Sequence, residues 1–137
     1  MKVTCGLILD NNKILVVQRG TNQHHAGKWE FPGGKVKQNE SINSCLKREL
    51  LEELNIDVEI YDQLQIVEYI YPEFEIELIP LICQIDNGKI LLKEHAAMKW
   101  CSFDELLDLD FSEADRVIIQ RIKKAGRLPA LGNSDKK

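Results

Sequence analysis

The sequence has few of the features that would mark a secreted, membrane-bound or zinc-binding protein. Its cysteines, Cys5, Cys45, Cys83 and Cys101, are scattered and form no C-x-x-C pair, which argues against a zinc site or a redox dithiol. We expect all four to be reduced and to pack as small hydrophobic side chains. There is no apolar run of transmembrane length and no charged-then-apolar signal region, so we predict a cytoplasmic protein without membrane association.

Positive charge is also scarce. The chain has 18 Lys and Arg against 22 Asp and Glu, which gives a net charge of −4 at pH 7. A broad electrostatic grip on polymeric nucleic acid needs a basic surface, so we exclude nucleic-acid polymers as partners. A single phosphorylated small molecule remains compatible with this charge, because a few cations and a metal ion can hold it.

No internal repeat, linker or low-complexity segment interrupts the 137 residues, of which 44% are hydrophobic and 29% are charged. This composition is typical of a globular protein with its own core, so we predict one domain over residues 1–126. Gly126 is expected to end the last helix, and residues 127–137 are expected to form a flexible tail.

Apolar segments separated by turn residues predict a mixed α/β fold. Residues 3–10 and 13–18 predict a hairpin, and residues 58–71 and 74–85 predict a second one with its turn at Pro72-Glu73. The tight turns are expected at Asn11-Asn12, Phe31-Pro32-Gly33-Gly34 and Asp86-Asn87-Gly88. Strands and helices that alternate irregularly favour a mixed sheet with helices on both faces.

Three segments predict helices. Residues 41–54 carry an apolar stripe at helical spacing and can be capped by Ser41 or Asn39. A short helix is expected after Ser102, and Ser112 is expected to begin the last helix.

The most informative segment, residues 48–53, reads Arg-Glu-Leu-Leu-Glu-Glu. Glu49, Glu52 and Glu53 lie at positions i, i+3 and i+4 and therefore share one face of the predicted helix. Like charges at these spacings destabilise an isolated helix by about 0.2–0.5 kcal/mol per pair. A cluster of hard oxygen ligands is what a divalent cation such as Mg²⁺ requires, so this face predicts a metal site.

With the residues before it, this segment resembles the box of the Nudix hydrolase family, G-x5-E-x7-R-E-U-x-E-E-x-G-U, in which U is apolar. The residues in register are Gly34, Glu40, Arg48, Glu49, Leu50, Glu52, Glu53 and Ile56. Asn55 stands where the family has glycine, and Asn is the best substitute in the left-handed conformation that often follows a helix. The resemblance covers residues 1–126 and implies a Nudix α/β/α sandwich whose box forms a loop-helix-loop.

The resemblance also implies roles for the residues of the box. Glu49, Glu52 and Glu53 are expected to bind Mg²⁺, for which Mn²⁺ could substitute, with Glu53 as the principal ligand and Glu49 as the catalytic base. The Gly33 carbonyl is a further candidate ligand, because glycine lets the backbone approach a metal closely. Arg48 is expected to orient the glutamates through charge-assisted hydrogen bonds.

Glu94 lies outside the box, in a predicted loop. Its spacing to Trp100, Glu-x5-Trp, resembles the MutT-like branch, whose distal glutamate reaches back to the metal. Glu94 is therefore a candidate ligand or base, and the alternative is an ordinary surface glutamate. For His95 we expect packing or hydrogen bonding rather than catalysis.

Residues 18–36 resemble MutT-type nucleoside triphosphate pyrophosphohydrolases, which include enzymes that remove 8-oxo-dGTP and a group that prefers CTP and related nucleotides. The candidate substrate-binding residues are Arg19, Phe31, Lys35 and Asp115. Arg19 could bind phosphate oxygens or be an ordinary surface arginine, and Phe31 could flank the base or pack in the core. Asp115 could accept hydrogen bonds from a base or complement a helix N-terminus. The branch can carry Asn near Asp115, which puts a preference for 8-oxoguanine in question.

We therefore predict a Mg²⁺-dependent nucleoside triphosphate pyrophosphohydrolase that releases nucleoside monophosphate and pyrophosphate. Its expected role is sanitisation of the nucleotide pool. Its partner would be a small nucleotide, and it would act as a monomer or a homodimer. One alternative is hydrolysis of another nucleoside diphosphate linked to a group X. The other is a non-catalytic nucleotide-sensing module, although this box keeps all its acids.

Overall fold

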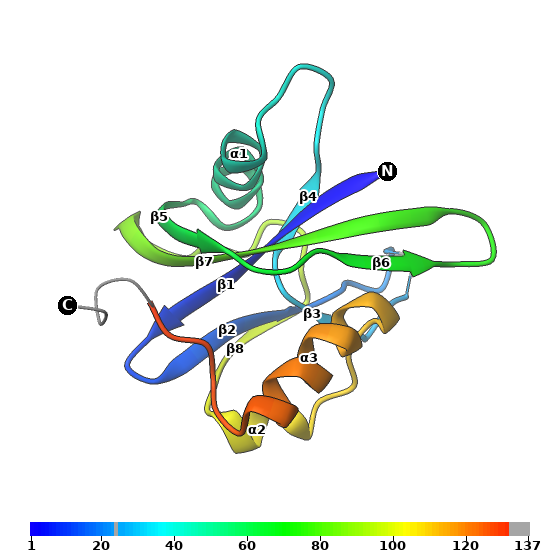
Figure 1. Cartoon of the computed structure of the whole chain (residues 1–137). Coiled ribbons are helices and arrows are strands. Elements are labelled where there is room, and N and C mark those ends of the chain that lie inside the picture. Colours follow the sequence, from blue (N-terminus) through cyan, green and yellow to red (C-terminus); the bar gives the residue numbers. More distant parts are fainter. Residues whose placement is uncertain (24, 132–137) are drawn as a thin grey trace.

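The computed structural model describes residues 1–23 and 25–131, and within them eight strands form one sheet whose main path runs β3-β2-β1-β7-β5 (Figure 1). The strands are β1 (Lys2–Asp10), β2 (Lys13–Gln18), β3 (Trp29–Glu30), β4 (Gly33–Lys35), β5 (Ile56–Gln63), β6 (Val67–Ile70), β7 (Glu75–Gly88) and β8 (Ala97–Cys101). The helices are α1 (Ile42–Leu54), α2 (Phe103–Leu107) and α3 (Glu113–Ala125). Strand β1 runs parallel to β7 and antiparallel to β2, so the predicted mixed sheet is confirmed.

Helices cover both faces of the sheet. Figure 1 shows α1 on one side and α2 with α3 on the other. Along β1, Cys5, Leu7 and Leu9 belong to the hydrophobic cluster beneath α3, whereas Ile8 belongs to the cluster beneath α1. A strand covered on both faces is apolar on both, which is why β1 reads as an uninterrupted apolar run. The predicted α/β/α sandwich is confirmed.

The first predicted hairpin is confirmed, and the second is present with its turn at Pro72-Glu73 but has a divided first strand. Asn11 and Asn12 have φ values of 49° and 63° in the turn between β1 and β2. The single strand predicted over residues 58–71 is instead two strands, β5 and β6, which pair with successive parts of β7. The break lies opposite Pro80, which accepts a hydrogen bond from Leu64 N–H but has no N–H to donate to the ladder.

Two predicted turns are wrong because each segment finds a partner strand far away in the sequence. Gly33 and Gly34 lie in β4, opposite Cys5 and Thr4 of β1. Residues 86–88 extend β7, where Gly88 pairs with Ile56. Local turn propensity is overridden in both cases by hydrogen bonds to a distant strand.

The helix ends follow the predicted signals, with one exception. The Ser41 side chain accepts a hydrogen bond from Ser44 N–H, and Asn55 ends α1 in the left-handed conformation. Ser102 forms a capping box at α2. Ser112 precedes α3, but its side chain makes no cap hydrogen bond. The Tyr71 hydroxyl instead accepts the Ala114 N–H, 3.2 Å away, at the start of α3.

The described C-terminal segment lies against the body of the protein. Leu128 and Leu131 pack against the cluster beneath α3, while residues 132–137 of the expected tail lie outside the described residues. All four cysteines are buried and free of disulfides, as predicted. Among the described residues, none of the helices is long and apolar enough to cross a membrane.

Candidate active site

Arg48, on α1, is the centre of a network of carboxylates. Its Nε and Nη2 donate to the two oxygens of Glu40 at 2.6 and 3.0 Å, and its Nη1 donates to Glu49 and Glu52 at 3.0 and 3.2 Å. A further bond from Nη2 reaches the Lys35 carbonyl at 3.1 Å. The guanidinium thus joins the end of β4, the loop before α1 and the helix itself, which are the contacts expected of an orienting arginine.

Glu40 serves as the rigid support of this network. Arg48 holds the pKa of its carboxyl down to about 2, with help from a hydrogen bond donated by Lys37 N–H. The Arg48 pKa is correspondingly raised, mainly by Glu40 and then by Glu49. Both groups are charged over the whole working range of pH, so the geometry does not depend on protonation.

The glutamates of the α1 face differ in their surroundings. The Glu49 side chain is 15% exposed and its carboxylate lies against Gly34, where a Cβ would collide with it. The Glu52 side chain is 57% exposed and bonds to Arg48 at the edge of the network. The glycine of β4 therefore makes room for Glu49, while Glu52 is the most peripheral of the three candidate ligands.

Glu53 is the unusual member of the set. Its Oε1 is buried and has no hydrogen-bond partner among the described residues. Burial raises the pKa of Glu53 to about 7; nearby His95 opposes the rise, and the carboxylates of Glu49, Glu30 and Glu94 add to it. A buried carboxylate oxygen without a donor is unfavourable unless a cation or proton satisfies it.

The loop of residues 89–96 brings Glu94 to this helix. Lys93 N–H donates to the Glu53 carbonyl at 3.2 Å, and Ala96 N–H donates to the Gln18 carbonyl at 2.9 Å. Glu94 itself is exposed, and its charge raises the pKa of Glu53. The structure thus brings Glu94 into the electrostatic neighbourhood of Glu53, although the two are 41 residues apart.

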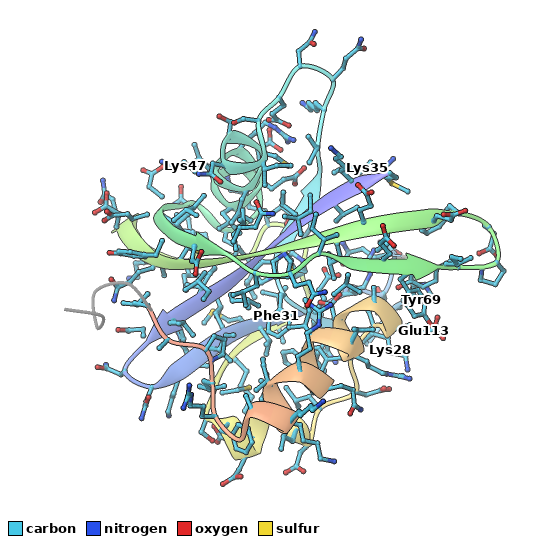
Figure 2. All side chains as sticks on the ribbon, viewed as in Figure 1. Lys28, Phe31, Lys35, Lys47, Tyr69 and Glu113 are labelled. Atoms are coloured by element: carbon cyan, nitrogen blue, oxygen red, sulfur yellow. The ribbon has the colours of Figure 1, made fainter. Side chains whose placement is uncertain are left out.

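A cavity of about 730 Å³ opens beside Glu53. Six of the predicted site residues line it: Arg19, Phe31, Gly33, Lys35, Glu53 and Asp115. Its wall does not include Arg48, Glu49, Glu52 or Glu94. Figure 2 shows Lys35 beside β4, and Lys47 on α1 well apart from it. The Lys35 side chain is exposed and forms no ion pair with any described residue.

Another part of the cavity wall is formed where β3 pairs with the segment that leads into α3. Trp29 N–H donates to the Asp110 carbonyl, and Ser112 N–H donates to the Trp29 carbonyl, both at 2.9 Å. This pairing brings Asp115, in the first turn of α3, to within 2.8 Å of Phe31 N–H. Burial raises the pKa of Asp115 to about 8, with a further contribution from Glu30.

Phe31 and Asp115 both line the cavity, and each also has a contact within the protein. The Phe31 ring is buried and packs on Phe111 with a centroid distance of 5.5 Å, so it belongs to the core as well as to the cavity wall. Asp115 binds the backbone of Phe31 rather than an N–H of its own helix.

Glu30, for which no role was predicted, joins two other polar residues of the cavity. Its Oε1 accepts a hydrogen bond from Arg19 Nη1 at 2.6 Å, and its Oε2 lies 3.3 Å from His95 Nε2. Arg19, predicted to contact phosphate, therefore has an ion-pair partner inside the protein. His95 is buried and hydrogen-bonded, as predicted. The sequence signal that could have identified Glu30 was its position between Trp29 and Phe31, two large apolar residues that face the interior.

The site fits a divalent cation at Glu53, although its carboxylates are not gathered around one point. Among residues 1–23 and 25–131, no group of three or more His, Cys, Asp or Glu side chains is arranged to hold a metal ion. Arg48 holds Glu49 and Glu52 instead. The buried unpartnered oxygen of Glu53 is the observation that favours a cation, with Glu49 and Glu94 as the nearby carboxylates.

Comparison with known proteins agrees with this geometry. A protein-family model described as NUDIX domain matches residues 1–122. The 8-oxo-dGTP diphosphatase of Buchnera aphidicola subsp. Acyrthosiphon pisum is 39% identical over 83% of this chain and 90% of its own length. The CTP pyrophosphohydrolase of Escherichia coli K12 is 32% identical over 88% of this chain and 89% of its own length. The solved MutT protein of Methanosarcina mazei Go1 has a TM-score of 0.79 at 26% identity, covering 91% of this chain and 94% of that one.

Proposed function

The chain belongs to the Nudix family of hydrolases, and from that premise we propose that it is a Mg²⁺-dependent nucleoside triphosphate pyrophosphohydrolase. The observation that carries the proposal is the buried Oε1 of Glu53, which has no hydrogen-bond partner in residues 1–23 and 25–131 and lies beside a cavity lined by the predicted substrate residues. Two relatives, named for 8-oxo-dGTP and for CTP, support a nucleoside triphosphate as the substrate class.

The reaction is the hydrolysis of one phosphoanhydride bond. The oxygen of a water molecule forms a new bond to phosphorus, and the bridging oxygen leaves with the other phosphoryl group. The products are nucleoside monophosphate and pyrophosphate, and the proton lost by the water passes to a base. Catalysis of such a transfer rests on positioning and charge neutralisation.

The residues of α1 and of the 89–96 loop would hold the cation. Glu53, Glu49 and Glu94 are the proposed ligands, with Glu52 at the periphery and the Gly33 carbonyl as a further candidate. When bound, Mg²⁺ neutralises phosphate charge and lowers the pKa of a coordinated water. Glu49 is the proposed base, because Arg48 and the space at Gly34 fix the position of its carboxylate.

The rest of the cavity would bind the nucleotide. The exposed ammonium of Lys35 can contact the phosphates without first giving up an ion pair to a described residue. Arg19 would contribute positive charge from within its pair with Glu30. The nucleobase would lie near Phe31 and Asp115. The Asp115 carboxyl, with a pKa of about 8, can donate or accept a hydrogen bond near neutral pH.

The test is a panel of NTPs, dNTPs and 8-oxo-dGTP, together with ADP-ribose and a dinucleotide polyphosphate, assayed for pyrophosphate or phosphate release with and without Mg²⁺. We expect metal-dependent turnover of a triphosphate that falls by about 10² or more in Glu53→Gln, because a neutral amide cannot bind the cation comparably. Glu68→Gln, on the exposed side of β6, is the matched control and should keep wild-type turnover.

Faster hydrolysis of ADP-ribose or of the dinucleotide than of any triphosphate would contradict the substrate class. Nucleotide binding in calorimetry without any Mg²⁺-dependent turnover would contradict the enzymatic function and favour a sensing module.

A further inference from the structure

The loop of residues 89–96 is fastened to the C-terminal end of α1 by three hydrogen bonds in series. The Asn55 side-chain Nδ2 donates to the Lys89 carbonyl at 3.1 Å. Leu91 N–H donates to the Leu54 carbonyl at 3.0 Å, and Lys93 N–H donates to the Glu53 carbonyl at 3.2 Å. Every second residue of the loop thus bonds to one residue at the helix end: Lys89 to Asn55, Leu91 to Leu54, and Lys93 to Glu53. Glu94 follows directly after the last of these anchors.

Two of these bonds use backbone groups that the end of a helix leaves free. The last carbonyls of an α-helix have no partner within it, and the loop supplies two N–H donors to them. Such bonds can form with any side chains. The bond from Asn55 is different, because it depends on a side-chain amide at one position.

Asn55 performs two separable tasks at that position. Its backbone adopts φ 63°, and its N–H donates to the Leu50 and Leu51 carbonyls, which closes the helix. A glycine, which the Nudix box has here, would meet this backbone requirement at least as well. A glycine could not make the bond to Lys89, so the amide adds a loop anchor that the box pattern lacks.

The anchor lies where the loop leaves β7. Gly88 has φ 99°, and a Cβ there would come within 2.5 Å of the Asn55 carbonyl, so the chain passes close to Asn55 at this point. The amide fixes Lys89, the first residue after β7, and the two backbone bonds fix the loop up to Lys93. Loss of the bond between Asn55 and Lys89 would release the loop at its start, the end farthest from Glu94.

We propose that Asn55 is a positioning residue that holds the Glu94 loop on the metal-binding helix and so sets the position of the Glu94 carboxylate relative to Glu53. This rests on the proposed function, in which Glu94 serves the cation. Asn55 itself need not touch substrate or cation. It acts by limiting the positions that Glu94 can adopt.

The test compares wild type, Asn55→Gly, Glu94→Gln and the double variant. Asn55→Gly keeps the left-handed backbone and removes only the amide, so the relief of backbone strain offsets the lost hydrogen bond and the melting temperature should stay within a few degrees of that of wild type. Asn12→Gly is the matched control, because Asn12 has the same φ of 63° in the β1–β2 turn, outside the cavity. Asn55→Asp keeps the size of the side chain but has no proton to donate at neutral pH.

The first measurement is amide hydrogen exchange of the metal-free proteins. In Asn55→Gly and Asn55→Asp we expect the Leu91 and Lys93 amides to exchange faster than in wild type, with the α1 amides unchanged. The Asn12→Gly protein should exchange like wild type at both amides. Unchanged exchange at Leu91 and Lys93 in both Asn55 variants would overturn the inference.

The second measurement is turnover as a function of Mg²⁺ concentration. Asn55→Gly should lower kcat by about two- to tenfold, the factor expected for one ordinary hydrogen bond, and should raise the Mg²⁺ concentration at half-maximal rate, with KM unchanged. In the Glu94→Gln background the same substitution should have no effect on kcat. An equal loss in both backgrounds would overturn the inference while leaving the proposed function intact.

Glu94→Gln alone separates the two hypotheses. If it reduces turnover while Asn55→Gly has wild-type kinetics, only the positioning role of Asn55 fails. If Glu94→Gln has wild-type kinetics, the assignment of Glu94 fails and the inference falls with it.

Discussion

At the scale of single residues, the buried carboxylates are the groups most out of place in this protein. Glu53 and Asp115 line one cavity, and burial raises the pKa of each toward or above neutrality. Buried carboxylates normally have a cation or several donors nearby. Asp115 has the Phe31 N–H, whereas Glu53 Oε1 has no partner among the described residues. Groups of this kind, in a cleft, are typical of functional sites.

The raised pKa of Asp115 predicts a pH-dependent stability. In the folded protein Asp115 keeps its proton up to a pH of about 8, whereas in the unfolded chain it loses the proton near 3.9. The folded state binds more protons between these values, so this group lowers the free energy of unfolding as pH rises through that window. Asp115→Asn should abolish that contribution and still accept the Phe31 N–H through its amide oxygen.

We therefore expect Asp115→Asn to melt at least about 2–4 °C above wild type at pH 8, the shift that corresponds to about 1 kcal/mol, and to lose that advantage toward pH 4. Thermal melts by circular dichroism at pH 4, 5, 6, 7 and 8 measure this. Glu53 also makes the melting temperature fall with rising pH, and it does so in both proteins. The effect of Asp115 is therefore the difference between the slopes of melting temperature against pH in the two proteins. A difference in melting temperature between the two proteins that stays constant from pH 4 to pH 8 would contradict a buried, protonated Asp115.

At the scale of elements, β4 connects the fold to the site. It pairs with β1, and its two glycines are needed for different reasons. A Cβ at Gly33 would collide with the Thr4 carbonyl and come within 2.7 Å of the Cys5 Cα, both of which are backbone atoms. A Cβ at Gly34 would collide with the Glu49 carboxylate, the far end of a side chain that can move.

The two glycine-to-alanine substitutions should therefore differ in their main effect: Gly33→Ala should mainly reduce stability, and Gly34→Ala should mainly reduce activity. Gly33→Ala must displace β1 or β4, so we expect a loss of about 2–4 kcal/mol in the free energy of unfolding. Gly34→Ala should displace Glu49 at a smaller cost in stability and lower kcat about tenfold or more. Urea unfolding and kcat, measured on both variants, check this. A stable Gly33→Ala protein, or a fully active Gly34→Ala protein, would contradict the account of β4.

The elements also show why some local predictions are right and others wrong. The start and end of α1 were predicted from Ser41 and Asn55, because capping depends on residues within a few positions of each other. The turns expected at Gly33-Gly34 and Asp86-Asn87-Gly88 are parts of strands, because their partners in β1 and β5 are tens of residues away in the sequence. Pro80 was a visible signal for the break between β5 and β6, but only pairing with β7 gives it that meaning.

At the scale of the whole molecule, the sheet separates two hydrophobic clusters that share its strands. Trp29 packs against the cluster beneath α3, and Trp100 packs against the cluster beneath α1. Strands β1, β2 and β7 contribute side chains to both clusters. Neither cluster can lose its packing without disturbing the strands that support the other, so cooperative unfolding is expected.

This arrangement allows each cluster to be observed separately. Trp29→Phe leaves Trp100 as the single tryptophan, and Trp100→Phe leaves Trp29. In urea, we expect each variant's fluorescence transition to coincide with its own far-ultraviolet circular dichroism transition, with equal m values for the two probes. A fluorescence midpoint that precedes the loss of secondary structure in one variant would show that its cluster opens independently.

The sequence by itself determined the family, the glutamates on α1, the caps of α1 and the layered α/β fold. These depend on short-range spacing and on alternation of apolar residues, which are written along the chain. It also identified Glu94 as a candidate, through a spacing that resembles a family pattern.

Only the tertiary structure decided which groups meet. It set Glu30 between Arg19 and His95, turned Asp115 toward Phe31 N–H, and tied the Glu94 loop to α1 through Asn55. It also left Glu53 Oε1 buried with no hydrogen-bond partner in the part of the chain that the structure describes. Contacts of this kind join residues 11 to 84 positions apart, and burial changes their pKa values only after the chain has packed. Local sequence patterns carry no information on such distances, which the pairing of distant strands and the packing of helices establish.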